Sequence, residues 1–280
     1  MRAKGIDISH WQGSFEDNGK LDFIIVKATE GFTYVDPEFE NFLNEVQKVP
    51  IRGAYHYFRT GLDPIAQAIH FVDTTKDKGF HFLAVDYEKT NNVLDKDGEI
   101  NLWIFWAKLL TLTNMQVVLY TSPYVYRDNL CAYNSAWRTA PVWMAHYNGL
   151  DPQNGSPLMF EGSQWVLWQY TNTGKGGDHG VESAAVDLNV YNGTVAQMKQ
   201  WIGFIKETEM NKNWFSKTVL FSILFGLTQL AGLYGYGDFS PSPELVQYVS
   251  IGISVIGAIV GVVVKYFENK DLTLTNSHST

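Results

Sequence analysis

Cysteine and basic residues are scarce in this sequence of 280 residues. A single cysteine, Cys131, excludes an internal disulfide and a cysteine-rich zinc site. Acidic residues outnumber lysine and arginine, and the formal net charge is −8. Nucleic acid is therefore not expected as a partner, because phosphate binding requires a basic face. The opening MRAKGIDISHWQG lacks the apolar core of a secretory signal peptide, so we expect synthesis to leave the first part of the chain in the cytoplasm.

Motifs for phosphate and zinc binding are also missing. The GKGG stretch at 174–177 has neither the spacing nor the Ser or Thr of a phosphate loop, and we interpret it as a loop. No G-x-G-x-x-G follows the first strand-like segment. The histidines His10, His56 and His146 do not have zinc-ligand spacing such as H-E-x-x-H. We therefore expect the protein to need no cofactor and no metal ion.

The last part of the chain differs in composition from the rest, and the change falls near residue 204. The stretches 218–236 and 245–264 contain no charged residue, and each is long enough to cross a bilayer as a helix. Two buried helices of a soluble domain are the alternative. Neither stretch has a polar stripe, which favours a transmembrane hairpin. We therefore predict two parts, residues 1–203 and a membrane region at 204–280.

The charges around the two spans predict their orientation. Lysines flank the outer ends of the hairpin, whereas the connection GDFSPSPE between the spans is acidic. The positive-inside rule then keeps both termini cytoplasmic. Gly257 and Gly261 form a GxxxG step, which indicates self-association through close helix packing.

The first 203 residues alternate between strand-like and helix-like segments. Eight β-rich runs occur: GIDIS, FIIVKAT, RGAYHYF, FLAVDYE, QVVLYTS, PVWMAHY, WVLWQYT and AAVDLNVY. Helical patterns cover residues 36–49, 63–75 and 99–113, whereas the later connections are too polar and Gly-rich for full helices. This alternation predicts an α/β fold with a parallel sheet, most simply a compact β/α barrel of eight strands. An open Rossmann-like sheet is the alternative.

Four acidic residues fall at the ends of these runs. In AVDYEK, Asp86 and Glu88 lie one residue apart, so strand alternation points both to the same face, roughly 6 to 7 Å apart along the chain. Asp7 ends the first run and Asp187 the eighth, and barrel closure makes these two strands neighbours. We expect the four carboxyls to share one mouth and to raise at least one pKa there.

Such a cluster suits glycoside hydrolysis, which needs one protonated and one ionised carboxyl group. Helix caps and surface ion pairs are the alternative for any single acid, and a Mg²⁺ or Ca²⁺ site is the alternative for the cluster. Aromatic and amide side chains at other strand ends fit sugar rings: Tyr55, Tyr120, Trp143 and Gln169 with Tyr170.

The quoted segments resemble, in order and spacing, a known enzyme family. GIDISHWQG, VKATEGFTYVDPEF, GAYHYF, AVDYE, LYTSPY, VWMAHY, LWQYT and VDLNVYNG are similar to the family 25 glycoside hydrolases, the Chalaropsis-type lysozymes common in phage endolysins. The resemblance covers about residues 4–203. It implies a flattened β/α barrel that hydrolyses the β-1,4 bond between N-acetylmuramic acid and N-acetylglucosamine in peptidoglycan.

The resemblance also implies roles for individual residues. Glu88 is expected to be the general acid, and Asp86 to orient the substrate N-acetyl group. Asp7 and Asp187 are expected to line the same pocket, and Glu30, within the VKATEG segment, to contact substrate. Whether a carboxylate or the substrate amide attacks the sugar stays open.

The tail departs from this family, whose endolysins usually carry a wall-binding module. The segment MNKNWFSKTVLFSILFGL, which begins at Met210, resembles the opening of a small phage holin. We therefore interpret the chain as a phage or prophage muramidase fused to a holin-like hairpin, located in the host cytoplasm and cytoplasmic membrane until it acts on the wall. A membrane-anchored, non-catalytic sugar-binding barrel is the competing hypothesis, and the intact D-x-E argues against it.

Overall fold

A computed structural model describes residues 1–88, 96–132, 134–160 and 162–203. The predicted spans 218–236 and 245–264 lie outside these residues. Within the described part of the chain, no helix has the length and apolar character needed to cross a membrane.

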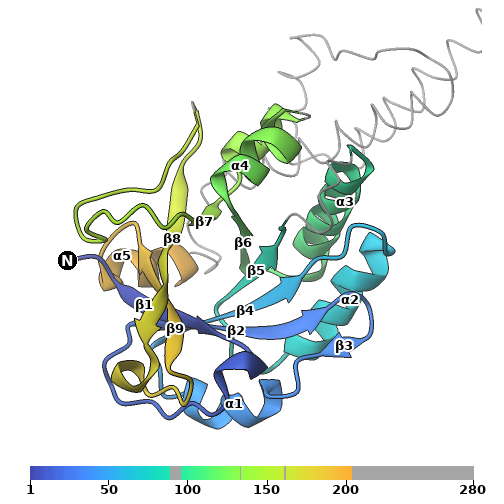
Figure 1. Ribbon diagram of the computed structural model, residues 1–280. Helices are drawn as coiled ribbons and strands as arrows, with labels where there is room; N and C mark the ends of the chain where they lie inside the picture. Colours follow the sequence, from blue (N-terminus) through green and yellow to red (C-terminus); the bar gives the residue numbers. More distant parts are fainter. Residues whose placement is uncertain (89–95, 133, 161, 204–280) are drawn as a thin grey trace, which may run out of the picture. The chain divides into compact units, whose positions relative to one another are not determined.

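Eight strands close into a barrel, and a short ninth strand extends one edge (Figure 1). The barrel order is β1-β9-β8-β7-β6-β5-β4-β2, with β1 paired to β2 to close it and β3 attached to β2. The strands are β1 (Lys4–Ile8), β2 (Phe23–Glu30), β3 (Tyr34–Val35), β4 (Ile51–Tyr57), β5 (Phe82–Asp86), β6 (Gln116–Thr121), β7 (Val142–Ala145), β8 (Trp165–Lys175) and β9 (Ala185–Tyr191).

The predicted barrel is confirmed, but the prediction of a parallel sheet is wrong for its last strand. β9 runs antiparallel to both of its neighbours, β8 and β1, whereas the other barrel strands are parallel. Asp187 therefore lies near the beginning of its strand and not at the end. Because the strand is reversed, its beginning lies at the same mouth as the C-terminal ends of the parallel strands.

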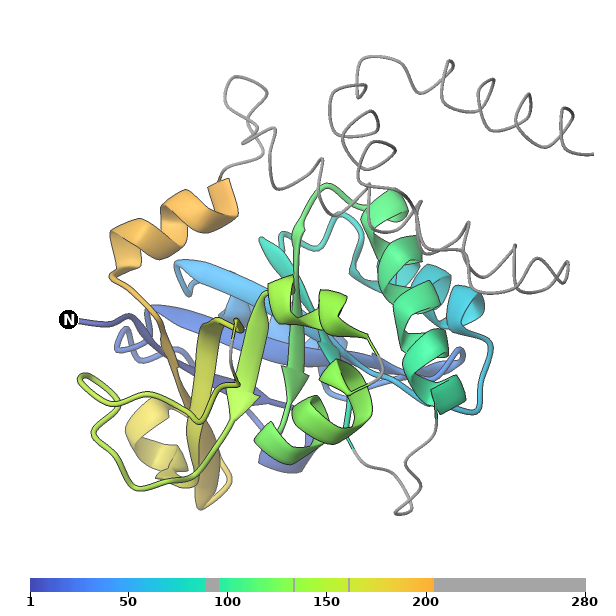
Figure 2. The ribbon, with the colours of Figure 1, turned by 90° about the horizontal axis from the view of Figure 1, so that it is seen from above.

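The three predicted helices are confirmed as α1 (Phe39–Val46), α2 (Pro64–Thr75) and α3 (Lys96–Leu112). The start of α2 shows why the local sequence forms a helix. The Asp63 side chain accepts hydrogen bonds from the backbone N–H groups of Ile65 and Ala66, at 2.8 and 3.1 Å, and Pro64 takes the first helical position. Figures 1 and 2 show α2 and α3 side by side on one flank of the barrel.

The second half has shorter helices, as its polar and Gly-rich connections predict. It contains α4 (Pro123–Val125), a π-helical turn at Tyr126–Cys131, a 3₁₀ turn at Ser135–Thr139, a second 3₁₀ turn at Gly176–His179, and α5 (Val195–Gly203). The GKGG stretch forms the end of β8 and the first part of that second turn, within the connection that leads to β9.

Aromatic and aliphatic side chains fill the barrel. The ring of Phe82 occupies space that Gly53 on the neighbouring strand leaves free, since a Cβ atom at Gly53 would lie 2.4 Å from that ring. α5 packs on the same core through Met198 and Trp201, and the Trp201 carbonyl accepts a hydrogen bond from Gln116 at the start of β6. The core is thus sealed by α5 at one end, which leaves the opposite end for the site.

Candidate active site

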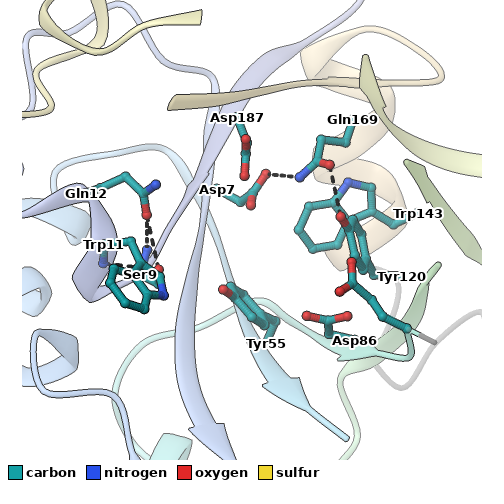
Figure 3. A pocket seen from close by; sticks show the side chains of 11 residues that line it. Asp7, Ser9, Trp11, Gln12, Tyr55, Asp86, Tyr120, Trp143, Gln169 and Asp187 are labelled. Atoms are coloured by element: carbon teal, nitrogen blue, oxygen red, sulfur yellow. Dashed lines mark hydrogen bonds between the residues drawn. The ribbon is translucent and has the colours of Figure 1, made fainter. Parts of the chain in front are cut away.

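A cavity of about 200 Å³ opens at the C-terminal ends of the parallel strands (Figure 3). Every barrel strand except β2 contributes one side chain to it, and two short segments after strands β1 and β5 contribute the rest. The lining residues are Asp7, Ser9, Trp11, Gln12, Tyr55, Asp86, Glu88, Tyr120, Trp143, Gln169 and Asp187. The four predicted carboxyl groups are therefore brought together in one pocket.

Asp86 and Glu88 stand on one side of this pocket. Asp86 is buried, and no described residue donates a hydrogen bond to its Oδ1 atom. Burial, with the charge of Glu88 as the next cause, raises the pKa of Asp86 well above its usual range. Glu88 is exposed at the mouth, yet desolvation of its carboxyl group raises its pKa, although the polar hydroxyl of Tyr120 opposes the shift. The two acids together are therefore expected to keep a proton.

Asp7 and Asp187 form a second carboxyl pair. They lie directly opposite each other in the β1–β9 register, so two ionised carboxylates at these positions would repel each other, which favours a proton on one of them. Burial, followed by the charge of Asp7, raises the pKa of Asp187 to about 8. Burial also raises the pKa of Asp7, although hydrogen bonds from Gln169 and Asn189 partly offset it. The pair behaves as one titrating unit that retains a proton at neutral pH.

Two amides hold Asp7 in place. Gln169 Nε2 and Asn189 Nδ2 both donate to Asp7 Oδ1, at 2.9 and 2.6 Å. Gln169 Oε1 accepts from the hydroxyls of Tyr120 and Tyr147, at 3.0 and 2.5 Å, and Asn189 Oδ1 accepts from Trp143 Nε1 at 2.8 Å. Each amide is thereby fixed in orientation, and the shared proton is directed to the other oxygen of Asp7, toward Asp187.

Four of the five predicted substrate-binding residues line the pocket: Tyr55, Tyr120, Trp143 and Gln169. The amide oxygen of Gln169 and the indole N–H of Trp143 are already used in the network around Asp7. These two side chains therefore position Asp7 and shape the wall, and their direct contact with substrate stays a prediction.

Glu30 is the exception, because the structure places it outside the pocket lining. Its carboxylate accepts a hydrogen bond from Lys27 at 2.7 Å and pairs with Arg59. Burial alone would raise the pKa of Glu30, but these two cationic partners outweigh it and lower the pKa. The Lys27 ammonium also lies 5.2 Å from the centre of the Tyr57 ring. Glu30 thus holds Lys27, whose charge partly opposes the rise in the pKa values of Asp86 and Glu88.

The structure adds several residues that the sequence analysis did not single out. Ser9 and Gln12 form a capping box around the 3₁₀ turn His10–Gln12, and the S-x-x-Q spacing was a signal for it. Asn189 follows Asp187 by two residues, so strand alternation places both on one face. Tyr147 follows β7 and ends the VWMAHY segment, but no role was predicted for it. In the described part of the chain, no three His, Cys, Asp or Glu side chains are grouped to hold a metal ion.

A closed α/β barrel with acidic groups at the mouth is an architecture of hydrolytic enzymes, and comparison with known proteins identifies the class. Residues 6–179 match the model of the family described as Glycosyl hydrolases family 25. The chain belongs to this family of lysozymes, or muramidases, which are peptidoglycan hydrolases.

Two sequence relatives illustrate the range of the family. Lysozyme M1 of Streptomyces globisporus is 32% identical over 214 residues, which cover 70% of this chain and 70% of that protein. The uncharacterized protein YegX of Escherichia coli K12 is 33% identical over 217 residues, covering 73% of this chain and 75% of that protein.

Solved structures agree with the fold. The lysozyme from Streptomyces coelicolor superposes with a TM-score of 0.63 at 28% identity, covering 73% of this chain and 98% of that one. The catalytic domain of endolysin ply40 from bacteriophage P40 of Listeria monocytogenes gives a TM-score of 0.57 at 23% identity, covering 72% of this chain and 98% of that one. This second likeness concerns the fold alone.

Proposed function

We propose that this pocket cleaves the β-1,4 bond between N-acetylmuramic acid and N-acetylglucosamine, with Glu88 as general acid. The observation that carries the proposal is the buried Asp86 Oδ1, which no described residue bonds, in the same pocket as a carboxyl group that is accessible from the mouth. A buried carboxylate oxygen that no protein group bonds is costly unless a molecule that enters the pocket donates to it. It is explained if a substrate N–H donates to it.

Asp86 and Glu88 take different roles because one proton is shared between them. The charge of Glu88 is the second cause of the raised pKa of Asp86, so a proton on Glu88 allows Asp86 to ionise. Glu88 then donates its proton to the glycosidic oxygen as the bond to the leaving sugar breaks. Asp86 faces the positive charge that develops on the remaining sugar, and it accepts a hydrogen bond from the substrate acetamido N–H.

The second half of the reaction reverses the role of Glu88. Having lost its proton, Glu88 takes one from a water molecule that attacks the anomeric carbon. The attacking group of the first half is either Asp86 or the carbonyl oxygen of the substrate amide, which Asp86 would hold in place. Both routes use two displacements and give the same retained configuration. The proton held between Asp7 and Asp187 limits the negative charge of the pocket to what these steps require.

The chemistry of the product tests the bond that is cleaved. Purified peptidoglycan is digested with the protein, and the new sugar ends are reduced with borohydride and identified by mass spectrometry. A muramidase exposes reducing ends of N-acetylmuramic acid, so we expect the muramitol derivative. Glucosaminitol ends would mean that the other glycosidic bond is cut. An absence of new ends would support the competing hypothesis of a non-catalytic sugar-binding barrel.

We further propose that the chain serves host lysis for a phage or prophage, and that residues 204–280 insert into the cytoplasmic membrane. Support comes from the two uncharged stretches, the flanking lysines and the acidic connection between them. In this proposal the barrel waits on the cytoplasmic side. Hairpins that pack through Gly257 and Gly261 open lesions that admit it to the wall.

Extraction of membranes with alkaline carbonate tests the tail. We expect the full chain to stay in the membrane pellet, because two spans bury their apolar side chains in lipid. The matched control is a chain that ends at Gly203, which should appear in the supernatant. Release of the full chain would contradict the membrane proposal. Expression of residues 210–280 alone then separates a holin-like hairpin, which collapses the membrane potential, from a passive anchor, which does not.

A further inference from the structure

Trp11 is the one lining residue of the pocket whose large aromatic side chain stands mostly in solvent. It is 77% exposed, whereas Trp143 in the same pocket is 2% exposed. The proposed chemistry gives Trp11 no part, because the indole carries no group that titrates or attacks. An indole in water does not gain the free energy of burial. A ligand that covers the exposed ring at the rim would therefore gain binding free energy.

The turn that carries Trp11 is fixed from within. Ser9 Oγ accepts from the backbone N–H of Trp11 at 3.4 Å, and Gln12 Oε1 accepts from the backbone N–H of Ser9 at 2.8 Å. The neighbouring His10 ring lies 4.5 Å from the Trp11 ring, centre to centre. His10 Nδ1 is in turn 2.7 Å from Oδ2 of Asp36, whose side chain is fully buried.

The same turn is also held by hydrogen bonds to the connection between β8 and β9. The backbone N–H of Ser183 donates to the Gln12 carbonyl at 3.1 Å. The Glu182 carboxylate accepts from both the backbone N–H and the hydroxyl of Ser14, at 2.9 and 3.0 Å. The turn is therefore hydrogen-bonded to the β8–β9 connection, which restricts its movement. A rigid support lets an exposed ring bind a ligand with little loss of conformational entropy.

The pocket is too small to enclose more than a short part of a polymeric substrate. Its volume of about 200 Å³ is below the range of roughly 300 to 1,000 Å³ typical of ligand pockets. A glycan strand continues on both sides of the cleaved bond, so the neighbouring sugars must lie on the rim. In Figure 3, Trp11 stands with Ser9 and Gln12 on one side, and Tyr120, whose hydroxyl influences the pKa of Glu88, stands on the other.

From this arrangement we propose that Trp11 is a stacking platform for the sugar next to the one in the pocket, on the side away from Glu88. The ligand is an N-acetylhexosamine ring of the glycan strand, and the apolar C–H face of the ring lies against the indole, whose face is electron-rich. Glu88 protonates the leaving sugar, so Trp11 holds the part of the strand that stays after the first step. This inference rests on the proposed function and adds a specificity residue to it.

Sugar binding to a catalytically impaired variant tests the role of Trp11 separately from turnover. In Glu88→Gln, the affinities for N-acetylmuramic acid and for the disaccharide N-acetylglucosaminyl-N-acetylmuramic acid are measured by calorimetry. We expect the second sugar to strengthen binding. Adding Trp11→Ala to Glu88→Gln should remove about tenfold of the disaccharide affinity and leave the monosaccharide affinity unchanged, because loss of one aromatic anchor is of that order.

Two substitutions separate a flat ring from mere apolar bulk. Trp11→Tyr keeps a stacking face and should retain most of the disaccharide affinity, whereas Trp11→Leu should behave like alanine. Tyr124→Ala is the matched control, since Tyr124 is 63% exposed and does not line the pocket. It should change neither affinity.

Turnover on peptidoglycan provides the second measurement. Trp11→Ala in the otherwise native chain should raise KM about tenfold and change kcat less than threefold, because the ring binds sugar without touching the reacting bond. An unchanged KM and disaccharide affinity would overturn the platform, and so would an equal loss of both affinities. If native protein released no sugar ends at all, the proposed function would fail instead, which the digestion of peptidoglycan detects separately.

Discussion

Glu88→Gln is expected to lower turnover on peptidoglycan by about 10² or more, the usual contribution of a positioned acid. Glutamine matches glutamate in shape and keeps a polar group beside Tyr120. It cannot release a proton to the glycosidic oxygen. The midpoint of thermal unfolding should stay close to the native value, because Glu88 lies at the exposed mouth and not in the core.

The comparison that isolates the acid is Glu40→Gln. Glu40 lies on α1, its side chain is 62% exposed, and it pairs with Lys78 outside the pocket. This control should lyse cell walls at the native rate. If Glu88→Gln also cleared walls at nearly the native rate, Glu88 would not be the proton donor. Rates are measured as the release of reducing ends from purified peptidoglycan, in a range where substrate saturates the enzyme.

Asp187→Asn is expected to stabilise the barrel by about 1 to 3 kcal/mol at pH 8 and to change little at pH 4. The pKa of Asp187 is raised to about 8 in the folded chain, whereas an unfolded aspartate titrates near 3.9. A raised pKa means that the stabilising protonated form is fully present below about pH 4. Its contribution is lost as the pH rises toward 8. Asparagine has no such loss, and its amide can donate to Asp7 at every pH.

Denaturant unfolding of the chain that ends at Gly203, at pH 4, 6 and 8, measures this difference. The native chain should lose stability relative to Asp187→Asn as the pH increases. The matched control is Asp73→Asn, an exposed aspartate on α2, which should follow the native curve. Parallel curves for the native chain and Asp187→Asn would mean that the carboxyl pair holds no proton in the folded state.

Much of the site was predictable because it depends on strand periodicity. Alternation along AVDYE placed Asp86 and Glu88 on one face, and the structure brings both into one pocket although β5 ends at Asp86. Tyr55 was predicted for the site from its position at a strand end, and it lines the cavity. The roles of these residues in catalysis and binding stay predictions.

Strand direction was harder to predict, because alternation of side chains is the same in both directions. In the structure, the connection between β8 and β9 covers only residues 176–184, because β8 continues four residues beyond the predicted run WVLWQYT. A parallel crossover needs a dozen or more residues, so this short Gly-rich link indicates a hairpin and a reversed last strand. Asp187 reaches the mouth for this reason, and not because it ends a parallel strand.

Contacts between segments distant in sequence could not be derived from local patterns. Glu30 lies in a segment that resembles the family motif, but its environment depends on Lys27 and on Arg59, which comes from beyond the next strand. Similarly, the hydroxyl of Tyr147 and the amide of Asn189 meet the Asp7 network only after the barrel closes. Sequence spacing contains no information on such partners.

The reversal of β9 also determines at which end of the barrel the chain reaches Gly203. Because β9 begins at the mouth, it ends at the other end of the barrel, where α5 then covers the core through Met198 and Trp201. Gly203 is therefore reached at the closed end, remote from the carboxyl groups. A surface, a bead or a second protein coupled to this residue would start from that end and leave the mouth open to a glycan strand. The fold thus provides a natural attachment point for immobilising the enzyme.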